Sequence, residues 1–71
     1  MFPNFNAEYA RCNLTLEKVV DELEKRGISM TVSTLSQKKN GKYPITLKEA
    51  KALKEIVNTD LPLDVLFQEA G

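Results

Sequence analysis

The sequence of 71 residues predicts a single all-α domain of five short helices. Three observations support this fold class. Thr15, Thr31 and Thr46 each stand just before a helical segment, where the hydroxyl can accept an N–H group of the first turn. Apolar residues recur at the spacing of a helix and do not alternate as in a half-buried strand. A chain of this length has room for one small core, which buries about 60% of the unfolded surface.

The first predicted helix covers about residues 6–12. Asn4 or Asn6 can cap its N-terminus, because asparagine is among the preferred capping residues. Phe5 and Tyr9 fall on one face of this segment, which is therefore the side expected to pack on the core.

The second predicted helix covers about residues 16–26 and follows Thr15. Its buried stripe has the i, i+3, i+4, i+7 spacing of a helix face: Leu16, Val19, Val20 and Leu23. Gly27 suits the end of this helix, because glycine adopts the left-handed conformation that often follows a last helical turn.

The third predicted helix covers residues 32–39, between the cap Thr31 and the pair Asn40-Gly41. It is unusually polar, and Leu35 is the only large aliphatic residue in its middle. An ordinary core helix carries a broader apolar stripe. This helix is therefore either a solvated element or a surface that meets a polar partner.

The fourth and fifth predicted helices cover about residues 47–57 and 63–69. Thr46 and Glu49 have the spacing of a capping box, which is the clearest helix start in the sequence. The fourth helix has an expected buried stripe: Leu47, Ala50, Leu53, Ile56 and Val57. Pro62 suits the first turn of the fifth helix, where its missing N–H costs nothing.

Composition argues against several classes of site. Cys12 is the only cysteine and the chain has no histidine, so an internal disulfide is impossible and a zinc site is not expected. The longest apolar run, residues 63–67, is far shorter than the roughly 20 residues of a membrane span, and nothing resembles a signal peptide. There is no glycine-rich phosphate loop. We expect a cytoplasmic protein that is not an enzyme, with no metal, cofactor, small-molecule substrate or membrane partner.

Charge is unevenly distributed along the chain although the formal net charge is zero. Residues 25–48 contain six basic residues and no acidic one, and this window includes the polar third helix. One interpretation is that the lysines only solvate a surface. The other is a DNA-binding surface, because hydroxyl, amide and ammonium groups match base edges and phosphates.

Taken in order, these segments resemble the helix-turn-helix domain of phage repressors and Cro proteins, the Cro/repressor or XRE family. The likeness spans Ala7 to Phe67 and is carried by five segments: Leu14-Thr15, Ser33-Thr34-Leu35-Ser36, Asn40-Gly41-Lys42 with Pro44, Leu47 to Leu53, and Leu63-Asp64-Val65-Leu66-Phe67. The resemblance implies a lambda-repressor-like domain whose third helix lies in the major groove of double-stranded DNA. It also implies a bacterial or phage-encoded transcriptional regulator.

The resemblance implies roles for individual residues. The positions that match base-reading residues are Val32, Ser33, Ser36 and Gln37. The positions expected to hold phosphates are Thr15, Thr31, Lys38, Lys39, Asn40, Lys42 and Tyr43. Glutamine can bond adenine through both ends of its amide, serine can donate or accept, and valine can meet a thymine methyl group.

Three features depart from the family pattern. The spacing from Val19 to Leu35 is about five residues longer than in the usual motif with its short turn. Leu16 stands where the family often has a glutamine that contacts phosphate, and Val20 stands where it usually has alanine. The first departure predicts either a longer second helix or an expanded turn.

Two further questions stay open at this stage. A homodimer surface is one interpretation of the apolar residues near the C-terminus: Leu61, Leu63, Leu66 and Phe67. The alternative is that the last helix only covers the core. The alternative function is a protein-interaction module, an antirepressor or adaptor that has the helix-turn-helix fold without DNA binding.

Overall fold

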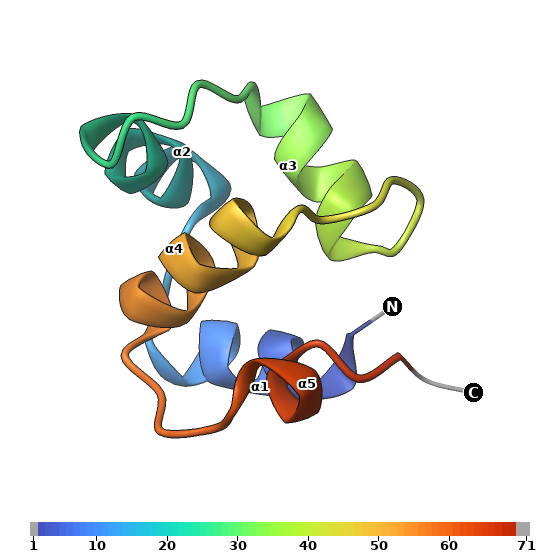
Figure 1. The fold of residues 1–71 in the computed structure, drawn as a ribbon. Helices are drawn as coiled ribbons and strands as arrows, with labels where there is room; N and C mark the ends of the chain where they lie inside the picture. Colours follow the sequence, from blue (N-terminus) through green and yellow to red (C-terminus); the bar gives the residue numbers. More distant parts are fainter. Residues whose placement is uncertain (1, 70–71) are drawn as a thin grey trace.

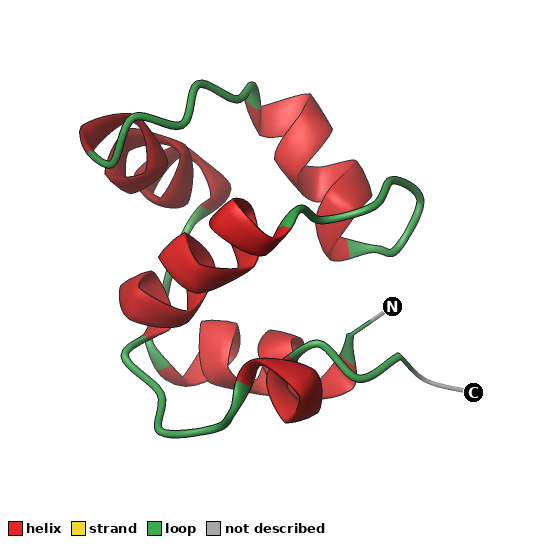
Figure 2. Cartoon of the chain, viewed as in Figure 1, coloured by secondary structure: helices red, strands yellow, loops and turns green. Residues whose placement is uncertain are grey.

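The computed structural model describes residues 2–69, which fold into five helices with no strand (Figures 1 and 2). The helices are α1 (Pro3–Arg11), α2 (Leu16–Lys25), α3 (Val32–Lys39), α4 (Leu47–Val57) and α5 (Leu63–Leu66). In Figure 1, α4 crosses the middle, with α2 and α3 on one side and α1 and α5 on the other. The predicted all-α fold class and the five helices are confirmed for this part of the chain.

The start of α1 differs from the prediction, because the helix begins at Pro3 rather than near residue 6. Proline suits this first position, since its fixed φ is already helical and its missing N–H would have no partner there. Neither Asn4 nor Asn6 caps the helix, so that prediction is wrong. The Asn4 side chain instead donates to the carbonyl of Val65 at 2.9 Å, which ties α1 to α5.

The starts of α2, α3 and α4 confirm the capping predictions. Each preceding threonine accepts a hydrogen bond from the backbone N–H three residues later, and these N–H groups belong to Lys18, Thr34 and Glu49. The carboxylate of Glu49 also accepts the Thr46 N–H at 3.0 Å, which completes the capping box. Local chemistry therefore sets these three starts.

The ends of α1, α2 and α3 are alike. Each is followed by a residue with positive φ, and these residues are Asn13, Gly27 and Gly41. The next N–H group then bonds back into the last turn, as in Ile28 to Leu23 at 2.9 Å and Lys42 to Gln37 at 2.8 Å. Leu14 and Ile28 occupy this position after α1 and α2 and pack on the core. After α3 the same position presents the exposed Lys42 to solvent.

The buried face of α4 is only partly the one predicted. Leu47 was expected in the core but is 64% exposed, whereas Ala52 is buried. Leu47 is the first residue of the helix, and helical side chains lean toward the N-terminus, so this one lies beyond the edge of the core. Because α4 packs against both α2 and α5, small residues on its flank are covered as well.

The fifth helix ends at Leu66, three residues before the predicted end at 69. Pro62 is its N-cap and lies outside the first turn. Phe67 leaves the helix and stacks on Phe5, with ring centroids 5.2 Å apart, and meets the edge of Phe2 at 5.6 Å. This aromatic cluster joins the two ends of the described chain, and its packing takes the place of further helical turns.

Candidate nucleic-acid interface

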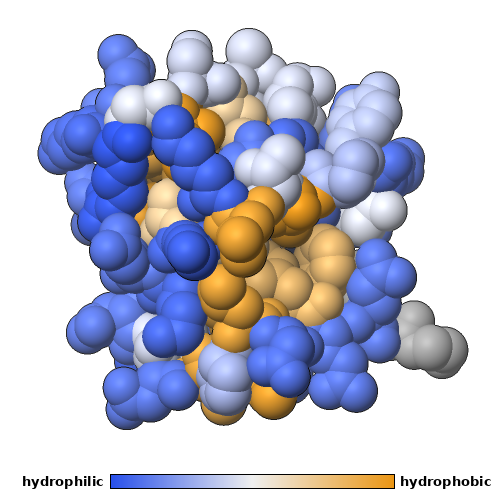
Figure 3. Space-filling model, in the orientation of Figure 1, coloured by the Kyte–Doolittle hydropathy of each residue, from blue (hydrophilic) through white to orange (hydrophobic). Residues whose placement is uncertain are grey.

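The third helix lies at the outer edge of the domain and is held by one apolar residue. Leu35 is 2% exposed and packs in the core, whereas Thr31 and Ser33 are exposed. Figure 3 shows pale side chains of weak hydropathy along the upper edge of the molecule, where Figure 1 places the start of α3. The helix therefore offers solvent a surface of hydroxyl groups rather than a dense layer of charge.

The connection between α2 and α3 is an expanded turn over residues 26–31. Ile28 is buried and Met30 packs on the core, so this turn is attached to the domain along its length. The longer spacing predicted either a longer second helix or an expanded turn. In the structure α2 ends at Lys25, and six residues separate it from α3. Leu16, the first residue of α2, is partly buried and packs against the core.

Three of the four predicted base-reading residues lie on the side of α3 that faces away from the core: Ser33, Ser36 and Gln37. At about 100° per residue, Ser33 and Gln37 lie almost directly opposite Leu35, and Ser36 lies beside them. Val32 is three residues before Leu35 and lies only about 60° from it around the helix, on the core side. Ser33 is exposed and the other three are half-buried. The structure therefore brings Ser33, Ser36 and Gln37 together on one accessible strip, and Val32 lies at the edge of this strip.

Lys38, a predicted phosphate contact, is engaged within the protein. Its ammonium lies 2.7 Å from both carboxylate oxygens of Glu49 on α4, and the two side chains are only 16% and 14% exposed. A phosphate contact would require this pair to separate. We therefore leave Lys38 out of the candidate phosphate-binding set.

Lys39 is directed toward α1 and away from the outer strip. Its ammonium lies 4.6 Å from the ring centroid of Tyr9, within the range of a cation–π interaction. Burial, and secondarily the charge of Glu17, raises the pKa of Tyr9, so the phenol stays neutral. We leave Lys39 out of the candidate set too. The sequence contained a signal for the placement of both lysines. Lys38 and Lys39 follow Leu35 by three and four residues, so they lie on the same side of the helix as this core residue.

Half of the six basic residues in the acid-free window of the sequence form ion pairs. Arg26 pairs with Glu22 and Glu55, both at 3.4 Å, and Lys25 pairs with Glu22 at 3.2 Å. Within residues 2–69, the basic residues of the window that make no ion pair and no aromatic contact are Lys42 and Lys48, and both are exposed.

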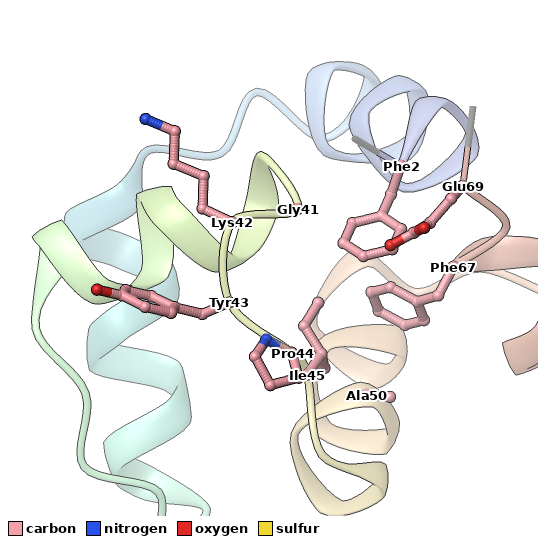
Figure 4. Close-up of a pocket in the computed structure, with 9 residues that line it drawn as sticks. All are labelled: Phe2, Gly41, Lys42, Tyr43, Pro44, Ile45, Ala50, Phe67 and Glu69. Carbon is pink, nitrogen blue, oxygen red and sulfur yellow. The ribbon is translucent and has the colours of Figure 1, made fainter. Parts of the chain in front are cut away.

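The other predicted phosphate contacts lie at the start of α2, at the start of α3 and just after the end of α3. Thr15 and Asn40 are exposed, whereas the hydroxyl of Thr31 also donates to the Thr34 hydroxyl at 3.0 Å. Tyr43 is 52% exposed. In Figure 4 the side chains of Lys42 and Tyr43 both point away from the neighbouring hollow, Lys42 toward solvent and Tyr43 toward α3.

That hollow is an open depression of about 490 Å³ between the α3–α4 loop and the chain ends (Figure 4). Its lining is largely apolar: Phe2, Gly41, Lys42, Tyr43, Pro44, Ile45, Ala50, Phe67 and Glu69. Figure 3 shows apolar side chains gathered over this region and the adjoining face of α4. Glu69 is the single carboxylate in the lining, so the hollow offers no pair of acids for acid–base chemistry.

The predicted dimer residues are not a contiguous exposed patch. Leu66 is fully buried, so it cannot contact a partner and that assignment is wrong. Phe67 is half-buried and packs against Phe2 and Phe5. Leu61 and Leu63 are half-buried as well. The reason is that α5 turns its apolar side inward, between α1 and α4.

Two other kinds of feature are absent from residues 2–69. No group of three or more metal-ligating side chains occurs in this part of the chain. None of its helices has both the length and the apolar character needed to cross a membrane. Comparisons with protein-family models, characterised proteins and solved structures found no match for this chain. The function must therefore be inferred from the residues and their geometry.

The pair between Lys38 and Glu49 predicts a specific loss of stability in acid. Burial raises the pKa of Glu49, but the hydrogen bonds from Lys38 and from the Thr46 backbone outweigh it and hold the pKa below the ordinary 4.5. A lowered folded-state pKa stabilises the fold above about pH 4.5, and this contribution is lost as the pH falls through the folded value. The difference in the free energy of unfolding between the native chain and Glu49→Gln should shrink from pH 6 through pH 4 to pH 3. Urea unfolding at these three pH values measures it. An advantage that stays constant down to pH 3 would contradict the assignment.

Proposed function

We propose that this protein is a sequence-specific DNA-binding transcriptional regulator of the repressor/Cro type, which reads the major groove with α3. One observation carries the proposal. The strip of Ser33, Ser36 and Gln37 faces away from the core and combines an amide with two hydroxyls. Val32 lies at its edge and adds a methyl-bearing side chain. These are the groups that can distinguish base pairs in the major groove.

The groups beside this strip suit the DNA backbone. Lys42 and Tyr43 lie in the loop that follows α3, and Lys42 supplies an exposed ammonium. At the other end, the N-terminus of α2 after Thr15 has free N–H groups that suit a phosphate. Asn40 completes the proposed backbone contacts. Two copies on a two-fold operator would place their α3 helices about 34 Å apart and would block access of polymerase.

Selection of bound duplexes from a random library tests this function directly. The native chain should enrich a defined sequence, and Gln37→Ala should relax the preference at one base pair, with a loss of about 1–3 kcal/mol at that pair. Lys42→Met is the control, because loss of a phosphate contact weakens all duplexes nearly equally. A uniform loss for Gln37→Ala would make this residue a backbone contact.

The second candidate is a protein-interaction module on the same fold. Two observations favour it: the net charge is zero, and most basic residues of the acid-free window have partners within the protein. Binding to a mixed duplex pool at low salt separates the two functions. No detectable affinity under those conditions would favour the adaptor or antirepressor.

A further inference from the structure

We propose that Lys38 and Glu49 form a positioning pair, which fixes the orientation of α3 and acts on DNA binding without touching phosphate. This inference rests on the proposed function and assigns a new role within that same site. It replaces the expectation that Lys38 is one of the backbone contacts.

The first step is the attachment of α3. Leu35 is the single buried residue of this helix, and the helix packs mainly on α2. One apolar anchor resists separation but does little to prevent rotation about the contact. Side chains that reach other helices from the last turn of α3 would supply the missing restraint.

The second step is the rigidity of the partner. The carboxylate of Glu49 accepts the N–H of Thr46 at 3.0 Å as part of the capping box, so it is held at the start of α4. Lys38 bonds both oxygens of this carboxylate at 2.7 Å. The end of α3 is therefore tied to a fixed point on α4.

The third step is the direction of Lys38. Lys38 flanks Leu35 on one side and Lys39, over the ring of Tyr9, flanks it on the other. The two lysines thus reach α4 and α1 in different directions, while Ser33 and Gln37 face outward. Such a two-sided restraint holds the outward strip at one angle to the rest of the domain.

Two substitutions separate positioning from phosphate contact. Lys38→Met keeps the aliphatic stem and removes the ammonium. Glu49→Gln removes the charge but keeps an acceptor for the capping box, where glutamine is also found. If the pair positions α3, each substitution lowers the fraction of molecules in which this helix has the orientation needed for binding. If that fraction falls to about a tenth of its native value, the Kd for DNA rises about tenfold.

The salt dependence of binding gives the second readout. If Lys38 and Glu49 are a positioning pair, a plot of log Kd against log salt concentration has the same slope in both variants as in the native chain. The double variant should then bind DNA no more weakly than either single variant. Lys42→Met is the matched control and should change the slope by about 0.9. If Lys38 contacts phosphate, Lys38→Met changes the slope similarly, whereas Glu49→Gln frees the lysine and tightens binding. That result would overturn the proposal.

A readout without DNA keeps the test independent of the proposed function. Amide hydrogen exchange in α3 should become faster in Lys38→Met and Glu49→Gln, relative to exchange in α2 of the same molecules. Unchanged protection of α3 would refute the positioning pair even if no duplex binds. Absence of duplex binding by the native chain, with faster exchange in the variants, would refute only the DNA-binding function.

Discussion

Leu35→Ala should be the most destabilising single change in α3, with a loss of about 3 kcal/mol in the free energy of unfolding. The side chain is 2% exposed and is the one buried anchor of the helix, so its removal leaves a cavity and frees α3 from α2. For a domain of this size the midpoint of thermal unfolding should fall by more than about 10 °C. Circular dichroism during heating measures this.

Leu47→Ala is the matched control for that change. It removes the same atoms from another helix, but Leu47 is 64% exposed, so the expected effect stays within about 0.5 kcal/mol. Equal losses in the free energy of unfolding for Leu35→Ala and Leu47→Ala would mean that α3 is not anchored through Leu35. Because the proposed DNA binding needs α3 in place, Leu35→Ala should also lose affinity for DNA at temperatures where Leu47→Ala keeps it.

Ser33→Glu should abolish specific DNA binding while leaving the fold at least as stable. Ser33 is exposed in the first turn of α3, where a carboxylate interacts favourably with the helix dipole by about 0.3–1 kcal/mol. In a major groove the same carboxylate would stand among phosphates and acceptor groups. Repulsion of several kcal/mol corresponds to a loss of affinity of more than about 100-fold.

Ala7→Glu supplies the control for the added charge. Ala7 is exposed on α1, and Figure 1 draws α1 at the opposite side of the molecule from the start of α3. The affinity of this variant for DNA should fall only slightly, as expected for one extra negative charge far from the DNA. A similar loss of affinity in the two variants, measured by fluorescence anisotropy with the selected duplex, would show that Ser33 does not face DNA.

Much of the fold was predictable because its signals are local. The three capping threonines and the glycines after α2 and α3 act within one turn of backbone, so the residues themselves set those helix boundaries. Leu35 is the only large aliphatic residue in the middle of α3, and it is the residue of this helix that is buried in the core. The outward strip of α3 then follows from the geometry of a helix.

The errors fall where distant parts of the chain meet. Phe67 packs on Phe5 and Phe2, and no local pattern reveals that this cluster ends α5 at Leu66. Leu47 fits the apolar stripe of α4, yet the core stops short of it. In each case the burial of a residue depends on which other helix covers it.

The amino-acid order alone established five helices, the threonine caps of α2, α3 and α4, and the polar character of α3. Tertiary packing decided which charges remain free, because Lys38 meets Glu49 and Lys39 meets Tyr9 across separate helices. A run of basic residues in the sequence is therefore not a basic surface. Coulomb interactions depend on separation in space, and folding brings acids from outside the window to within a few ångströms of its cations.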